Sequence, residues 1–181
     1  MLWDPQKFGI LEAEASRNYL SLVCSPVGDK ETYMITNVYG PQTQADKLKL
    51  LTSLEDLRAR HPNMPWIAAG AFNIIRSLLE KKGGTRQLGR DSKAFQDFIR
   101  NMGLVDTETI NGTFTWNNKQ GGASQVATKL DRVLISEDLL LTGPAITASI
   151  LPFGGSDHWP VQLEATFMGA LRNRPFKFEN A

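Results

Sequence analysis

The chain alternates apolar and polar side chains over residues 8–39 and then changes to a helical period over residues 44–60. A two-residue alternation is typical of strands with one buried face, and the Gly28-Asp29 pair favours a turn between antiparallel strands. In "QADKLKLLTSLEDLRAR" the leucines recur at three- and four-residue spacing, and a His-Pro pair ends the segment. These patterns predict three strands in a meander and a helix that packs on their sheet.

A buried strand and a second helix follow. The apolar run "WIAAGAFNII", residues 66–75, has the composition of a fully buried strand that ends at a glycine turn. The second helix is predicted over about residues 92–102, with Asp91 or Ser92 as its N-cap and Gly103 at its C-terminal end. Strand patterns then return in the segments "GTFTWNN", "TKLDRVLIS", "AITASILPF" and "HWPVQLEATF".

Helices set between groups of strands indicate an α/β (α+β) fold with a mixed sheet or two stacked sheets flanked by helices. No internal repeat or linker divides the sequence, so residues 1–181 are interpreted as a single domain. Within it we distinguish residues 169–181 as a C-terminal tail.

Composition limits the classes of function. The net charge of +1 gives no overall basic field, so binding to nucleic acid or to an anionic membrane would require a local patch. Cys24 is the single cysteine, which excludes an internal disulfide and a cysteine-rich zinc site, and its apolar neighbours indicate a core position. No segment approaches the roughly 20 apolar residues of a membrane helix, and no signal peptide pattern is present. We expect an intracellular, soluble protein that does not bind membranes.

Two polar positions stand out in the last third of the chain. Asp157 and His158 lie in "GGSDHWP", between two glycines and an apolar strand, and His is the side chain best suited to titrate near neutral pH. The alternative is a loop Asp that caps a turn beside an incidental His. Asp131 interrupts the apolar strand of "KLDRVLIS", where a carboxylate needs a partner such as His158 or Arg132. Its alternative role is an ion pair at the edge of a sheet.

Two further candidates lie where apolar strands end. Tyr39 in "NVYGP" precedes a Gly-Pro turn, from which its phenol could reach a phosphate or a leaving oxygen, although Tyr is common at strand ends. Asn73 follows the buried strand in "GAFN", and strand ends are where α/β folds place their chemistry. Neither residue alone predicts an activity.

The motifs together resemble the endonuclease/exonuclease/phosphatase superfamily. Their order is Tyr-Gly-Pro, Gly-x-Phe-Asn, Phe-Thr-Trp, Leu-Asp-Arg and Ser-Asp-His. The details "LWDP", "NVYGP", "GGTR", "FTWNN", "KLDRVLIS", "SDHWPV" and "RPFKFEN" are similar to the endonuclease domain of plant LINE-type non-LTR retrotransposons. The resemblance implies a four-layer α/β sandwich of two mixed sheets flanked by helices, and Mg²⁺-dependent cleavage of DNA phosphodiesters. A nuclear location follows from the resemblance only.

The resemblance also implies roles for individual residues. Asp157 would lie in the metal and water network, as a metal ligand, and His158 would hydrogen-bond the scissile phosphate. Asp131 would orient this histidine and favour its cationic form. Further matches are Tyr39 on the phosphate side, Asn73 holding the attacking water or phosphate, and Trp116, Asn118 and Arg132 meeting the nucleic acid.

Two departures from the family pattern argue against activity. Where the family has Gly-Asp-x-Asn, this chain has Gly-Ala-Phe-Asn, so the carboxylate that activates water is replaced by Ala71. The family's early motifs, an Asn on the first strand and a metal-binding Glu on the second, belong upstream of "LWDP", so we expect a domain without its first strands.

Three hypotheses follow. The chain is a degenerate, inactive or strongly impaired endonuclease-like domain, an active Mg²⁺-dependent endonuclease completed by another chain, or a nucleic-acid-binding module without catalysis. A sheet edge exposed by missing strands would also favour self-association.

Overall fold

The computed structural model describes residues 1–28, 30–85, 87–142, 144–152 and 155–166. Its main element is a six-stranded mixed sheet with the strand order β1-β2-β3-β4-β9-β6. The strands are β1 (Phe8–Ala15), β2 (Tyr19–Pro26), β3 (Tyr33–Tyr39), β4 (Trp66–Ala71), β6 (Leu104–Asp106) and β9 (Asp131–Ser136). The first three form the predicted antiparallel meander, although Asp29 of the predicted turn lies outside the described residues.

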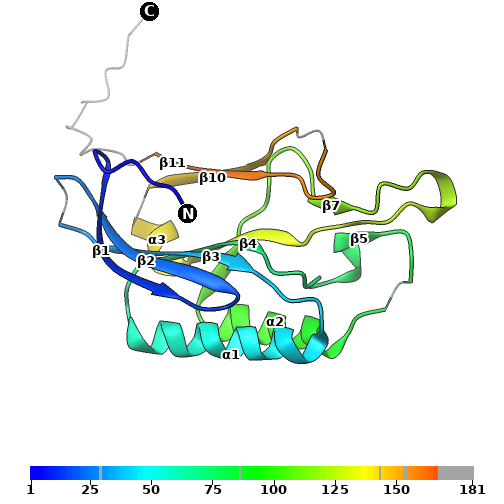
Figure 1. Cartoon of the computed structure of the whole chain (residues 1–181), viewed down its shortest axis with the longest axis horizontal. Helices are drawn as coiled ribbons and strands as arrows, with labels where there is room; N and C mark the ends of the chain where they lie inside the picture. Colours follow the sequence, from blue (N-terminus) through cyan, green and yellow to red (C-terminus); the bar gives the residue numbers. More distant parts are fainter. Residues whose placement is uncertain (29, 86, 143, 153–154, 167–181) are drawn as a thin grey trace, which may run out of the picture.

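Helices α1 (Gln44–Arg60) and α2 (Arg90–Asn101) cover one face of this sheet, as Figure 1 shows. Strands β3 and β4 are parallel, and α1 makes the crossover that a parallel pair requires. The side chains buried between helices and sheet include Leu54, Leu57, Trp66, Phe72, Phe95 and Phe98. This layer is the larger of the two cores.

The ends of α2 agree with the sequence at one terminus and differ at the other. Gly103 follows the helix with a φ of +59°, as the glycine pattern predicted. The N-cap is Gly89, and the prediction of Asp91 or Ser92 is wrong. The Asp91 carboxylate instead accepts a hydrogen bond from Lys47 Nζ on α1 at 3.2 Å, so it joins the two helices.

The other face of the sheet packs against a second layer. This layer contains the antiparallel pair β10 (Ala145–Ile150) and β11 (Val161–Thr166), which lies above the main sheet in Figure 1. Cys24, Ile67, Val133 and Ile135 form a second core here together with Tyr33 and Leu139 of α3 (Glu137–Thr142). The predicted core position of Cys24 is confirmed, and burial raises the pKa of its thiol.

Short elements complete the structure. Strands β5 (Lys81–Lys82), β7 (Trp116–Asn117) and β8 (Ala127–Thr128) form a three-stranded sheet, and η1 (Leu78–Glu80) and η2 (Gly122–Ser124) are single 3₁₀ turns.

The α/β class and the stacked sheets are confirmed. Within the described residues, the long helices α1 and α2 lie on one side only, and the paired strands β10 and β11 are antiparallel.

Two further predictions concern the margins of the fold. Strand β1 is an edge of the main sheet, and its Leu11 is exposed, but self-association through this edge stays a prediction. The proposed tail, residues 169–181, lies outside the described residues. In the part of the chain that the structure describes, no helix has the length and apolar character needed to cross a membrane.

Candidate phosphate-binding site

Tyr39, Ala71 and Asp131 form one row across three neighbouring strands. Tyr39 pairs with Ala71 in the β3–β4 register, and Ala71 pairs with Asp131 in the β4–β9 register. Residues directly paired across strands point to the same face of a sheet. This row therefore faces the β10–β11 layer, away from the two long helices.

Two glycines allow the strand ends to approach closely at this row. Gly70 has a φ of +134°, and a Cβ there would lie 2.1 Å from the carbonyl oxygen of Val38. A Cβ on Gly40 would lie 2.3 Å from the carbonyl oxygen of Phe72. Any side chain at either position would push β3 away from β4 and break the row.

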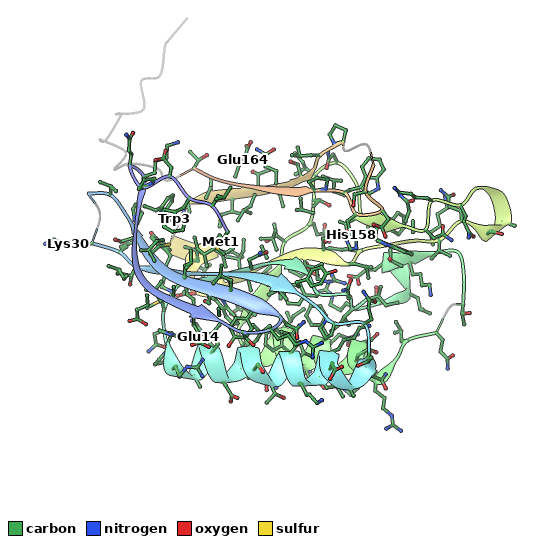
Figure 2. All side chains as sticks on the ribbon, in the orientation of Figure 1. Met1, Trp3, Glu14, Lys30, His158 and Glu164 are labelled. Atoms are coloured by element: carbon green, nitrogen blue, oxygen red, sulfur yellow. The ribbon has the colours of Figure 1, made fainter. Side chains whose placement is uncertain are left out.

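His158 and Asp131 contact each other beside the row. His158 Nδ1 lies 2.9 Å and 3.1 Å from the two carboxylate oxygens of Asp131. Figure 2 shows His158 between the main sheet and the layer above it. An Nδ1–H that donates to Asp131 leaves Nε2 as the ring nitrogen for a ligand. The Asp131 carboxylate is thus partnered by His158, one of the two partners that the sequence suggested.

Asp157 is held beside His158 by the segment around β7. Its main-chain oxygen accepts a hydrogen bond from the Asn117 N–H at 3.0 Å, and its carboxylate accepts one from Trp116 Nε1 at 2.9 Å. The Trp116 hydrogen bond lowers the pKa of the Asp157 carboxyl, so this exposed side chain is an anion at neutral pH. The indole N–H of Trp116 is therefore hydrogen-bonded to Asp157, next to His158.

Asn73 is buried at the turn after β4. It has a φ of +58°, a left-handed conformation that Asn tolerates better than most residues, and its Nδ2 donates to the Gly40 carbonyl at 2.6 Å. Among the described residues its Oδ1 finds no hydrogen-bond partner. Asn73 thus ties the end of β4 to the Gly-Pro turn, and its predicted role towards water or phosphate stays a prediction.

The remaining candidates differ in accessibility. The Tyr39 side chain is 71% exposed. Asn118 is half-buried, and its side chain donates to the Ser124 carbonyl and accepts from the Val126 N–H of its own hairpin. Arg132 is 1% exposed and lies on the helix side of the sheet, where it pairs with Glu80 and Asp106. The prediction that Arg132 meets nucleic acid is therefore wrong, because its guanidinium cannot reach a ligand.

Thr115 is a site residue that our sequence reasoning missed. Its Oγ1 accepts hydrogen bonds from the N–H groups of Leu130 and Asp131 at 3.0 Å and 2.9 Å. Its carbonyl accepts a third from the N–H of Trp159 at 2.7 Å. One buried residue thus fixes the backbone on both sides of the His158–Asp131 contact. Thr115 belongs to the motif "FTWNN", from which only Trp116 and Asn118 were predicted as site residues.

Thr115→Val is expected to lower the free energy of unfolding by about 1–3 kcal/mol, because two partly buried N–H groups lose their acceptor while the shape is kept. Urea denaturation would measure this loss. The control is Thr147→Val at an exposed position of β10, where the hydroxyl makes no hydrogen bond within the described residues and the change should stay within about 0.5 kcal/mol. Equal effects of the two substitutions would contradict the role given to Thr115.

Comparisons with known proteins identify the fold. No protein-family model matches the sequence, and no curated protein matches it. The structure superposes on the endonuclease domain of TRAS1, a telomere-specific non-LTR retrotransposon, with a TM-score of 0.64 and 14% identity, over 83% of this chain and 64% of that one. The chain has the endonuclease/exonuclease/phosphatase fold.

Two further structures share this fold. An endonuclease/exonuclease/phosphatase family protein from Bacteroides thetaiotaomicron matches with a TM-score of 0.57 and 14% identity, over 87% of this chain and 65% of that one. D. rerio TDP2 complexed with a single strand DNA product matches with a TM-score of 0.52 and 16% identity, over 86% of this chain and 66% of that one. The chain thus spans less than two thirds of the TRAS1 domain and about two thirds of the other two. The predicted resemblance is confirmed at the level of the fold.

The described side chains do not form a site for the Mg²⁺ expected of an endonuclease/exonuclease/phosphatase enzyme. Among the described residues, no three His, Cys, Asp or Glu side chains are grouped to hold a metal ion. Asp131 is paired with His158, and Ala71 beside it offers no ligand. Two carboxylates that follow Ala71 in the sequence, Glu80 and Asp91, do not replace the missing one, because Glu80 pairs with Arg132 and Asp91 with Lys47.

Proposed function

We propose that this chain is a degenerate endonuclease-like domain, of retrotransposon origin, that binds DNA phosphates at His158 and does not hydrolyse them at an appreciable rate. The observation that carries the proposal is the place of Ala71 in the row between Tyr39 and Asp131. The resemblance assigns a water-activating carboxylate to this position. A methyl group there can neither orient a water molecule nor accept its proton.

Magnitudes support an inactive domain over a merely slow one. General-base assistance is worth about 10²–10⁴-fold in rate. Catalytic groups that act as a unit are non-additive, so losing both a base and a metal site leaves little beyond binding. Plant origin and a nuclear location belong to this proposal through the resemblance alone.

Binding is supported by the groups that remain. The His158–Asp131 pair offers a hydrogen-bond donor that can carry positive charge towards a phosphate, with the exposed Tyr39 hydroxyl in the same row. The TRAS1 structure is that of an endonuclease domain, and the TDP2 structure holds a single strand DNA product, which makes DNA the ligand to test first.

The test combines binding with cleavage. We expect the unmodified chain to bind a duplex oligonucleotide with an affinity that falls as salt rises, and to leave supercoiled plasmid unnicked with Mg²⁺. His158→Ala should weaken binding by about tenfold or more, the value of a hydrogen bond to a charged group. The control is His61→Ala, which replaces the chain's other histidine, at the C-terminal end of α1. Mg²⁺-dependent nicking that His158→Ala abolishes would show an active endonuclease.

A further inference from the structure

A groove adjoins the proposed site on the side of Tyr39. It has a volume of about 530 Å³ and lies between the loop of residues 16–18 and the N-terminal half of α1. Its polar lining includes Arg17, Asn18, Gln42, Asp46, Lys49 and Ser53. Tyr39 belongs both to this lining and to the row that leads to Asp131, so the groove begins at the end of the row, on the side where α1 lies.

The loop that carries Arg17 is fixed to the strand that carries Tyr39. Asn18 Nδ2 donates to the Tyr39 carbonyl at 2.8 Å, and the Tyr39 N–H donates to the Asn18 carbonyl, also at 2.8 Å. Arg17 itself is exposed and makes no hydrogen bond or ion pair within the described part of the chain. The main chain next to Arg17 is therefore fixed, and the exposed guanidinium lies close enough to Asp46 for its charge to add to the hydrogen bond from Lys49 in lowering the pKa of that carboxyl.

The charges of the lining favour an anion. Arg17 and Lys49 are cationic, and Asp46 is the one carboxylate among the lining residues. Asp46 is already paired with Lys49 Nζ at 2.9 Å and accepts the Thr43 hydroxyl at 2.7 Å. Such an exposed ion pair is weak and screened by salt, so Lys49 can exchange Asp46 for a phosphate.

We propose that this groove binds a second phosphate of the nucleic-acid strand whose first phosphate lies at His158, through Arg17 and Lys49. This inference rests on the proposed function. Neighbouring strands are about 4.8 Å apart, so two strand spacings put the start of the groove roughly 10 Å from Asp131. The second phosphate is therefore a near neighbour of the first along the same strand.

The experiment is a salt titration of binding to a 20-base-pair duplex, followed by fluorescence anisotropy. Each lost phosphate contact reduces the slope of log K against log salt by about 0.9. Arg17→Gln is expected to reduce the slope by about that amount and to weaken binding several-fold at low salt. Asp46→Asn should act in the opposite direction, because it frees Lys49 and removes the carboxylate from the groove.

Lys7→Gln is the matched control, since Lys7 is an exposed cation that precedes the other end of β1. It should leave both slope and affinity unchanged. A duplex that binds, with weakening by His158→Ala but none by Arg17→Gln, would overturn the groove alone. Absence of binding by the unmodified chain would overturn the proposed function together with the groove.

Discussion

Arg132→Met is expected to lower the free energy of unfolding by about 3–5 kcal/mol, because it removes the buried cation that Glu80 and Asp106 share, leaving Asp106 to Lys129 and Glu80 to the partly exposed Arg76. The Arg132 guanidinium lies 2.9 Å from Glu80 Oε1 and 2.5 Å from Asp106 Oδ2, and it stacks over Phe95 at 5.3 Å. Urea denaturation followed by the fluorescence of the buried Trp66 would measure the loss.

Arg100→Met is the control for this substitution. Arg100 pairs with Asp97 on the exposed surface of α2 at 2.7 Å, so its loss should change the unfolding free energy by less than about 1 kcal/mol. An Arg132→Met protein as stable as this control would contradict the ion network described above.

The same network predicts how stability depends on pH, which can be measured even if Arg132→Met does not fold. Burial alone would raise the pKa of Glu80, but hydrogen bonds and charge from Arg132 outweigh it and hold that pKa below its ordinary value of 4.5. A carboxyl with a lower pKa in the folded state stabilises the protein above its unfolded pKa, and this stabilisation is lost as pH falls through the folded value. The unfolding free energy should therefore decline below about pH 4.5, and less steeply in Glu80→Gln than in Glu12→Gln, which changes an exposed glutamate on β1.

Arg132 also shows why one site residue was misplaced from the sequence. Neighbouring residues of a strand point to opposite faces, so Asp131 and Arg132 in "KLDRVLIS" could not both face the same ligand. The alternation of the strand places Arg132 on the face opposite to Asp131, which is the buried side towards the helices. The ion-pair partners of Arg132 cannot be predicted from local sequence, because Glu80 and Asp106 lie 52 and 26 residues away along the chain.

The parts of the fold that were predicted correctly depend on local patterns. The alternation in residues 8–39 and the leucine stripe of α1 report burial within a few residues, so the meander and the helix followed directly. The N-cap of α2 was not predicted correctly from the local pattern, because the Asp91 side chain forms an ion pair with Lys47 of another helix. Thr115 was missed for the same reason, since its role depends on Asp131 and Trp159, which meet it through the tertiary structure.

Ala71→Asp returns to the row a carboxylate that can act both as a base and as an oxygen ligand for Mg²⁺, so it is expected to raise Mg²⁺-dependent nicking of supercoiled plasmid by up to about 10²–10⁴-fold over the unmodified chain. The new carboxylate would stand between Tyr39 and Asp131 in the register of the sheet. Without metal ion it adds a negative charge next to Asp131, so binding of the duplex should weaken in EDTA and recover when Mg²⁺ is added.

Ala69→Asp is the matched control for this gain of function. Ala69 lies on the same strand and face, two residues earlier, in register with Asn37 and Val133 instead of Tyr39 and Asp131. It brings the same charge into the same layer, one row away from the histidine. Nicking by Ala71→Asp that His158→Ala removes, and that Ala69→Asp lacks, would establish that a single carboxylate separates this domain from catalysis. Equal inactivity of both aspartate variants would show that the carboxylate at position 71 is not sufficient for catalysis, and it would contradict the gain of function expected here.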